Sequence, residues 1–302
     1  MRELHSQQCT AGFCALLSCS AVLFLIIMKI RIEDEYEDVI AKAARGLGLS
    51  LPELSALVAS PESSLALLFE GNLDLPLLRA LAPLLGLNSD KLGVLAEHGW
   101  QPSIVGTIEG LRLYNTACPV PGYQAMTVNN YLVYDPSSRQ AAVFDTGVAP
   151  QALLADLKRE GLQLRALFLT HTHFDHVAAY QEIIQQTGCT LCYAPALEPF
   201  ENARPICAGD RVELGMLSIQ ARETAGHSKG GTTYVVDGLA KKIALVGDSI
   251  FCQSIGKAHA AYAQALCNNR EQILSLPAST VLCPGHGPLT TVAEELLHNP
   301  FF

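Results

Sequence analysis

The chain has 302 residues, a length that accommodates one large α/β domain and a small additional one. Its formal net charge is −9, and only 16% of its residues are charged whereas 49% are hydrophobic. A general nucleic-acid binder needs a basic surface, so this overall charge argues against that class of protein. The hydrophobic content is sufficient for a sizeable buried core.

The segment 1–30 contains an apolar run over residues 11–28, which is borderline in length for crossing a bilayer. Three interpretations stay open for this leader: a false start ahead of Met28, a membrane anchor, or a cleaved signal. No A-x-A cleavage site ends the run, which disfavours the signal. Ten cysteines without a regular spacing predict free thiols. We therefore expect a cytoplasmic protein, with anchoring through residues 11–28 as the alternative.

Residues 33–98 have apolar positions at helical spacing and predict a small all-α domain of five short helices. Capping residues and glycines indicate where each helix begins and ends. The expected helices are Tyr36–Arg45, a second after the Ser50–Glu53 capping box, a third opened by Ser60–Pro61 and ended by Gly71–Asn72, a fourth from Asp74 to Leu85, and a fifth over Asn88–Glu97.

Strand signals begin after Trp100, which we expect to pack at the junction of two domains, 33–98 and 101–302. Strands and helices then alternate to the end of the chain, in two halves that meet near residue 210. The first expected elements are strands at Ile104–Ile108, Leu111–Tyr114, Asn130–Tyr134 and Ala141–Phe144, a helix at Pro150–Glu160 and a strand at Ala166–Leu169.

A dense cluster of polar residues follows the strand that ends at Leu169. Three histidines and one aspartate lie within six residues, at His171, His173, Asp175 and His176. Neutral imidazole and carboxylate are the ligands that ions such as Zn²⁺ prefer. The first two histidines can point at one ion, and the Asp-His pair can turn toward a second.

Three further candidate ligands lie in loops that follow strand-like runs. His227 lies in T-A-G-H-S, Asp248 ends the apolar run A-L-V-G-D, and His286 lies in P-G-H-G. Each is a weak signal alone. Because all of them follow strands, they can converge with the histidine cluster at one edge of a sheet, where the glycines permit close backbone approach.

Taken in order, these motifs resemble the metallo-β-lactamase superfamily. The resemblance implies an αβ/βα sandwich, preceded here by the all-α domain, and two divalent metal ions, with zinc expected and iron or manganese as alternatives. It also implies that His171, His173 and His227 hold one ion, that Asp175, His176 and His286 hold the other, and that Asp248 bridges both. The implied chemistry is attack of a metal-bridging hydroxide on a carbonyl, with Asp175 and Asp248 as catalytic residues.

Within that superfamily the chain looks like the glyoxalase II group, through G-D-S-I-F at 247–251, S-I-G-K at 254–257 and the ending P-G-H-G-P-L-T-T with N-P-F. The resemblance implies a thioester substrate, hydroxyacyl-glutathione or a related acyl thioester, with Lys257 near a glutathione carboxylate. His259 stands where that group has a tyrosine and is a second candidate for substrate contact. A lactone hydrolase on the same centre, or a ligand-sensing regulator, stays open as an alternative.

The segment 33–98 resembles the Cro/repressor-type helix-turn-helix family through residues 47–54 and 81–87. Its charge contradicts DNA binding, because it has eleven acidic residues and four basic ones. The expected recognition helix, Glu62–Glu70, has no Lys or Arg to contact phosphate. We therefore expect DNA binding to be absent, and a module for homo-oligomer formation, a lid or partner docking instead.

Overall fold

The computed structural model describes residues 30–117 and 126–302. The interpretations of residues 1–30 as a leader, anchor or signal therefore lie almost wholly outside the described residues. Within those described ranges, no helix combines the length and the apolar character needed to cross a membrane.

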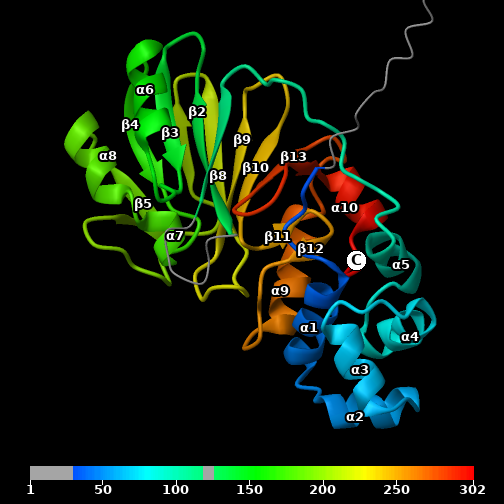
Figure 1. Ribbon diagram of the computed structural model, residues 1–302. Helices are drawn as coiled ribbons and strands as arrows, with labels where there is room; N and C mark the ends of the chain where they lie inside the picture. Colours follow the sequence, from blue (N-terminus) through cyan, green and yellow to red (C-terminus); the bar gives the residue numbers. More distant parts are fainter. Residues whose placement is uncertain (1–29, 118–125) are drawn as a thin grey trace, which may run out of the picture.

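Two six-stranded sheets form the centre of the molecule (Figure 1). Sheet A contains, in spatial order, β1 (Leu111–Ala117), β2 (Thr127–Tyr134), β3 (Gln140–Phe144), β4 (Gln163–Phe168), β5 (Cys192–Pro195) and β6 (Arg204–Ile206). Sheet B contains β14 (Thr290–Thr291), β13 (Val281–Pro284), β10 (Ile243–Gly247), β9 (Thr232–Asp237), β8 (Leu217–Glu223) and β7 (Arg211–Leu214). The sheets therefore divide the chain between residues 206 and 211, where the sequence predicts that two halves meet.

The inner faces of the two sheets pack on one another through large apolar side chains. Phe144 and Phe168 of sheet A stack with ring centroids 5.0 Å apart, and Tyr234 of sheet B lies 5.6 and 5.2 Å from them. All three are fully buried. The central strands β2, β3, β9 and β10 are buried almost throughout, and one apolar face of each sheet lies in a shared core.

Helices cover both outer faces, which gives the expected αβ/βα sandwich (Figure 1). On sheet A lie α6 (Gln151–Arg159) and α8 (Tyr180–Thr187), and the one-turn helix α7 (Phe174–Val177) lies at the sheet edge. On sheet B lie α9 (Tyr262–Asn268), the π-helical turn η2 (Asn269–Ile273), α10 (Val292–His298) and the N-terminal helices. A small hairpin, β11 (Ile250–Phe251) with β12 (Ser254–Ile255), follows β10.

The N-terminal helices, which we call the helical unit, have the bounds α1 (Tyr36–Leu47), α2 (Leu51–Val58), α3 (Glu62–Phe69), α4 (Leu75–Leu81), η1 (Ala82–Leu85) and α5 (Ser89–Ala96). The Ser50–Glu53 capping box is present, and Asp74 caps α4 by accepting from the Leu77 amide at 3.0 Å. The fourth helix changes to 3-10 geometry after Leu81, where Pro83 cannot supply the amide that a continued α-helix needs.

The strand expected at Ile104–Ile108 is wrong, since this segment has no regular secondary structure. Ile104 is 86% exposed and pairs with no strand, so the apolar alternation there reflects a connecting segment. The other strands named from the sequence exist, and β1, β2, β3 and β4 are each longer than expected.

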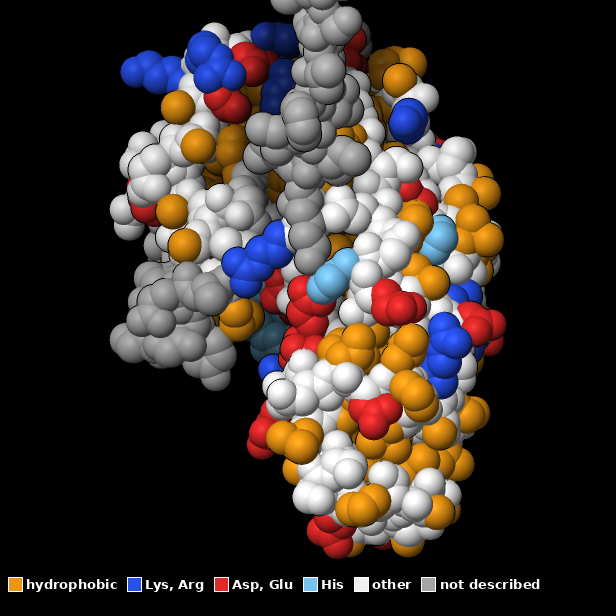
Figure 2. Space-filling view, turned by 45° about the vertical axis from the view of Figure 1, so that its right-hand side comes forward, with side chains coloured by type: hydrophobic (Ala, Val, Ile, Leu, Met, Phe, Trp, Pro, Cys, Tyr) orange, Lys and Arg blue, Asp and Glu red, His pale blue; other side chains and the backbone are white. Residues whose placement is uncertain are grey.

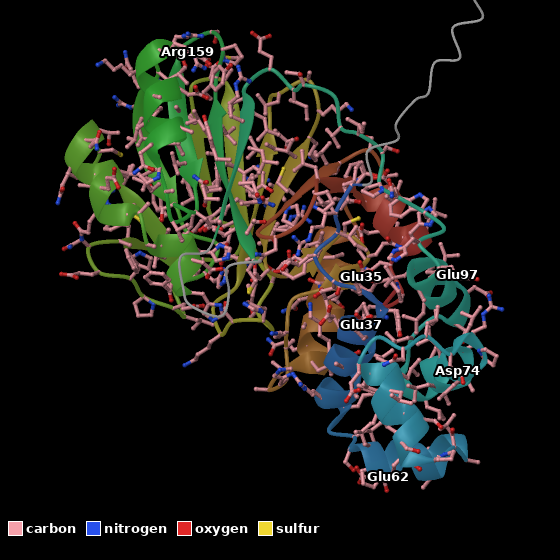
Figure 3. All side chains as sticks on the ribbon, viewed as in Figure 1. Glu35, Glu37, Glu62, Asp74, Glu97 and Arg159 are labelled. Atoms are coloured by element: carbon pink, nitrogen blue, oxygen red, sulfur yellow. The ribbon has the colours of Figure 1, made fainter. Side chains whose placement is uncertain are left out.

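The helical unit shares one hydrophobic core with sheet B. Leu78 and Leu81 belong to the same buried cluster as Val246 and Leu282. Trp100, which follows α5, stacks on His298 of α10 with ring centroids 4.0 Å apart, and the division into two domains at this position stays a prediction. Acidic side chains are scattered over the helical unit, and Figure 3 labels Glu35, Glu37, Glu62, Asp74 and Glu97 there.

Candidate metal centre

Four strand ends deliver the predicted ligands to one edge of the sandwich. The histidine cluster follows β4, His227 lies between β8 and β9, Asp248 follows β10, and His286 follows β13. Three overlapping groups have ligand atoms that all lie within 4.8 Å of one another. The groups are His171–His173–His227, His171–His176–Asp248 and Asp175–His176–His286. All seven predicted side chains therefore meet at this edge.

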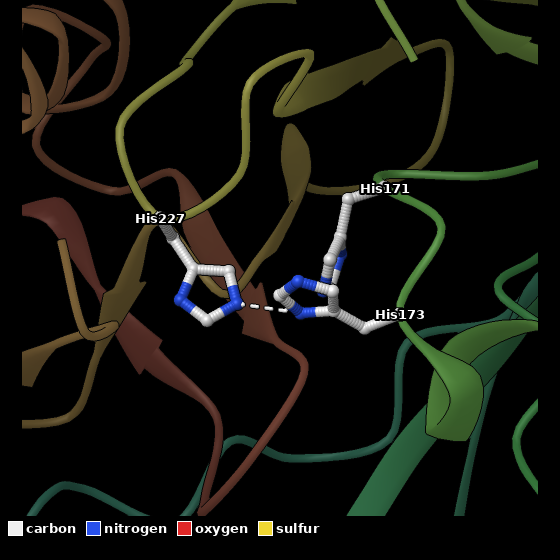
Figure 4. Close-up of side chains that lie close together, drawn as sticks. All are labelled: His171, His173 and His227. Carbon is white, nitrogen blue, oxygen red and sulfur yellow. Dashed lines mark hydrogen bonds between the residues drawn. The ribbon is translucent and has the colours of Figure 1, made fainter. Parts of the chain in front are cut away.

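The first group consists of imidazoles from two loops (Figure 4). Nε2 of His227 lies 3.0 Å from Nδ1 of His173, and the rings of His171 and His173 are 4.5 Å apart between centroids. His171 is buried, whereas His173 is exposed to solvent. One nitrogen atom from each of the three rings is thus close enough to the others for all three to bind a single ion.

The group Asp175–His176–His286, which we call the second group, lies deeper and contains a carboxylate. Oδ2 of Asp175 lies 3.8 Å from Nε2 of His176 and 3.4 Å from Nε2 of His286. Asp175 and His176 belong to α7, whose single turn directs both side chains toward the same point.

Asp248 lies between the two groups. Its Oδ2 is 3.4 Å from Nε2 of His227 and 3.4 Å from Nε2 of His286, and its Oδ1 is 3.4 Å from Nε2 of His176. A close backbone approach makes this possible, because a Cβ on Gly285 would lie 2.2 Å from Oδ1 of Asp248. One carboxylate is therefore in reach of both groups.

Three buried polar atoms of the centre have no hydrogen-bond partner among the described residues. They are Nε2 of His171, Nε2 of His176 and Oδ1 of Asp248. An unpartnered buried polar group is costly, so a cluster of such groups close together indicates a binding site for a ligand. Nitrogen and carboxylate donors together suit Zn²⁺, iron or Mn²⁺, and the residues present therefore fit divalent metal ions.

The charges of the cluster lead to the same conclusion. Burial would raise the pKa of Asp248, but His286, His176 and His227 outweigh it and hold that pKa well below its usual range. Burial would lower the pKa of His286, yet Asp248 and Asp175 raise it to about 12. The carboxylates thus attract positive charge to this point, and bound cations would supply it with the histidines neutral.

The Nδ1 atoms of two buried histidines, His286 and His176, are held in place by hydrogen bonds. His286 Nδ1 lies 2.6 Å from the Thr127 carbonyl oxygen, and His176 Nδ1 lies 2.8 Å from Oδ2 of Asp145. Donation from Nδ1 in these bonds leaves Nε2 free to face the centre.

Asp145 is a residue of the site that the sequence analysis did not identify. It is 3% exposed, and besides His176 it accepts from the backbone amide of Thr170 at 2.7 Å and from the Thr170 hydroxyl at 2.8 Å. It therefore ties the start of the histidine cluster to α7. Its signal in the sequence is an aspartate directly after the apolar strand β3, the same pattern that identified Asp248.

Glu198 is a second residue that the sequence analysis missed. Its Oε1 accepts from the amide and hydroxyl of Thr172, at 3.0 and 2.8 Å, and its Oε2 accepts from the Gly230 amide at 3.0 Å. Thr172 lies between two of the histidines, and Gly230 lies in the loop of His227. One carboxylate thus joins the two loops of the first group. Glu198 lies in a turn after β5, where no sequence motif indicates this role.

Lys257 and His259, the two residues predicted to contact substrate, are exposed and are not part of the ligand groups. The carbonyl oxygen of Lys257 is 3.0 Å from Nδ1 of His227, while the Lys257 side chain is exposed. His259 is also exposed and belongs to none of the three ligand groups. Their roles in substrate binding stay predictions.

The Metallo-beta-lactamase superfamily model matches residues 124–286, and the helical unit lies outside this match. A hydroxyacylglutathione hydrolase from Methylobacillus flagellatus is 32% identical over 161 residues, which are 52% of this chain and 62% of that protein. The chain therefore spans less than two thirds of the length of this relative. The likeness of the helical unit to a helix-turn-helix stays a prediction.

Two crystal structures are similar to the sandwich. One is the BLEG-1 B3 metallo-beta-lactamase, with a TM-score of 0.52 and 28% identity, covering 63% of this chain and 99% of that one. The other is TTHA1623 in a di-iron-bound form, with a TM-score of 0.50 and 27% identity, covering 63% and 100%. The family model covers more than half of the chain, and the two-sheet sandwich with a ligand cluster at its edge is consistent with that match. This chain belongs to the metallo-beta-lactamase superfamily.

Proposed function

We propose that the protein is a thioester hydrolase that uses two divalent metal ions and acts on hydroxyacyl-glutathione or a related acyl thioester. The position of Asp248 carries the two-ion part of this proposal, because one carboxylate oxygen lies 3.4 Å from histidine nitrogens of both groups. The relative named hydroxyacylglutathione hydrolase supports the thioester part.

In this proposal His171, His173 and His227 hold one ion, and Asp175, His176 and His286 hold the other, with Asp248 shared. The ions, when bound, would activate water and polarise a carbonyl group. The protein itself holds the histidine ligands in fixed orientations. Asp145, the Thr127 carbonyl and the Lys257 carbonyl fix the orientation of three imidazole rings.

The proposal is tested by metal analysis of the purified, metal-loaded protein beside assays with a thioester of glutathione, a lactone and a β-lactam. We expect two ions per chain and release of free thiol from the thioester. Asp248→Ala should reduce thiol release by more than the roughly 10- to 100-fold that is typical of residues which only orient a ligand. The matched control is Glu70→Ala, which removes an exposed carboxylate on the helical unit.

Some results would count against this function. One ion per fully loaded chain would remove the shared role of Asp248. Ring opening of the lactone without any thiol release would select the lactone alternative on the same centre.

A further inference from the structure

A cavity of about 290 Å³ lies beside the metal centre, between the segment Arg31–Glu33 and the edge of sheet A. The facing wall consists of side chains of β1 and β2, namely Leu113, Asn115, Thr127 and Asn129. The cavity adjoins the centre because the Thr127 carbonyl oxygen contacts His286 at 2.6 Å, and Gly287 lines the cavity as the next residue.

The segment 31–33 is held at both ends and so forms a fixed wall. On one side the Ile30 amide donates to Oε1 of Gln101 at 3.4 Å. On the other side Asp34 is buried in an ion pair with Lys42 of α1. The backbone of Glu33 also lies close to Gly287, since a Cβ on that glycine would be 3.3 Å from the Glu33 nitrogen.

Two of the residues that line the cavity on this wall carry opposite charges, namely Arg31, which is exposed, and Glu33. No ion pair joins Arg31 or Glu33 to any residue in the described ranges, and Lys42, a nearby cation, is engaged by Asp34. The side chain of Glu33 is partly buried. A charge held at the rim of a cavity, with less water than a free surface group, binds an opposite charge more strongly than an exposed one does.

The facing wall offers an acceptor rather than a further charge. The Asn115 side-chain nitrogen donates to Oγ1 of Thr127 at 2.9 Å and to Oδ1 of Asn129 at 2.8 Å. No described residue donates to its Oδ1, which can therefore accept a hydrogen bond from a ligand N–H group. Together the two walls present an anion, a cation and a carbonyl acceptor.

We propose that this cavity binds an α-amino acid head group, with the ammonium of the ligand on Glu33 and its carboxylate on Arg31. The inference rests on the proposed function, since the head group would be one end of a thioester whose carbonyl group reacts at the adjoining metal centre. A thioester of glutathione has such an end, at its γ-glutamyl residue. The segment that selects this substrate precedes the part of the chain that the family shares.

The test compares two substrates that differ in one charge: a glutathione thioester and the same compound acetylated on its α-amino group. Glu33→Gln should raise KM for the amine-bearing substrate by about 10-fold or more, with little change in kcat, and leave KM for the acetylated one unchanged. Arg31→Gln should raise KM for both substrates, because both keep the carboxylate. Glu70→Gln and Arg45→Gln, which remove one charge each from the helical unit, are the controls.

A binding measurement separates failure of this inference from failure of the proposed function. Calorimetry with the metal-loaded protein would compare glutathione with N-acetyl-glutathione, whether or not any thioester is hydrolysed. Tighter binding of glutathione by about 10-fold, abolished by Glu33→Gln, supports the cavity. Equal binding of both compounds, or an unchanged preference in a Glu33→Gln protein with full metal content, overturns it.

Discussion

Asp145 is a buried residue outside the metal-binding groups that is hydrogen-bonded to one of their histidines. Its carboxylate accepts from Nδ1 of His176 at 2.8 Å and from the Thr170 amide at 2.7 Å. In Asp145→Asn the amide oxygen must keep the Thr170 bond, so the NH₂ group would face Nδ1 and force the proton onto Nε2. We expect metal affinity to fall roughly 10- to 100-fold in competition with a chelator.

The matched control for that substitution is Asp135→Asn. Asp135 is equally buried and accepts from Ser137 and from the Met216 amide, in a turn remote from the ligand groups. It should lose stability and keep its metal affinity. Equal metal affinity in wild type and Asp145→Asn would show that the His176 bond has no positioning role.

Glu295 predicts a pH dependence of stability. It is fully buried, and burial raises its pKa from 4.5 to about 7 despite hydrogen bonds from Thr290, Asn299 and the Gln253 amide. Because the folded-state pKa is raised, its contribution to stability is complete below pH 4.5 and is lost as pH rises toward 7. Relative to Glu295→Gln, the wild type should lose on the order of 3 kcal/mol across that window.

Urea unfolding of the metal-free proteins at several pH values measures this difference. The neighbouring Glu294 serves as a control, because its pKa is shifted in the opposite direction. Burial acts to raise its pKa, but hydrogen bonds from Ser103 and Thr291 outweigh burial and lower it. Its stabilising contribution should be lost as pH falls through that lowered value. A wild type that stays parallel to Glu295→Gln from pH 4.5 to 7 would contradict the shift.

At the scale of elements, Lys42 of α1 joins the helical unit to the hairpin that precedes Lys257. It is 6% exposed, pairs with Asp34, donates to the Ile255 carbonyl oxygen at 2.7 Å and lies 5.1 Å from the Phe251 ring centroid. Lys42→Met should cost about 3–5 kcal/mol of unfolding free energy, because it leaves a buried carboxylate without its cation.

Denaturant unfolding of the double variant Lys42→Met/Asp34→Asn gives the check. Removing both charges should recover part of the loss, since no uncompensated ion remains. A double variant as unstable as Lys42→Met alone would show that the loss comes from packing rather than from the unpaired Asp34.

The sequence predicts those elements whose cause is local. Capping chemistry at Ser50 and Asp74 defines where two helices begin, and the strands before His171, Asp248 and His286 are predicted from apolar runs. Long-range contacts leave no such mark. The approach of Asn115 and Thr127 to residues 31–33, and of Glu198 to both histidine loops, depends on how the sheets and the N-terminal segment pack. Ile104–Ile108 has the alternation of a strand but finds no strand to pair with.

At the scale of the whole molecule, the helical unit has one buried face and one exposed surface. One face shares the buried core of sheet B. Elsewhere its surface exposes hydrophobic side chains (Figure 2). Leu57 and Leu67 are exposed by 56% and 52%. The formation of homo-oligomers through this unit stays a prediction. The shared core has a consequence that a single chain can show, namely that the helical unit and the sandwich should unfold together.

Trp100 makes this cooperativity measurable, because it is the one tryptophan of the chain and stacks on His298 at the junction. Its fluorescence reports separation of the two units, whereas far-ultraviolet circular dichroism reports loss of all helices. If Leu78, Leu81, Val246 and Leu282 form one core, both signals should change at the same urea concentration. A fluorescence transition at lower urea, with most helical signal retained, would instead show that the helical unit separates first. The wild-type curves should be measured at fixed metal concentration, since bound ions stabilise the sandwich by mass action.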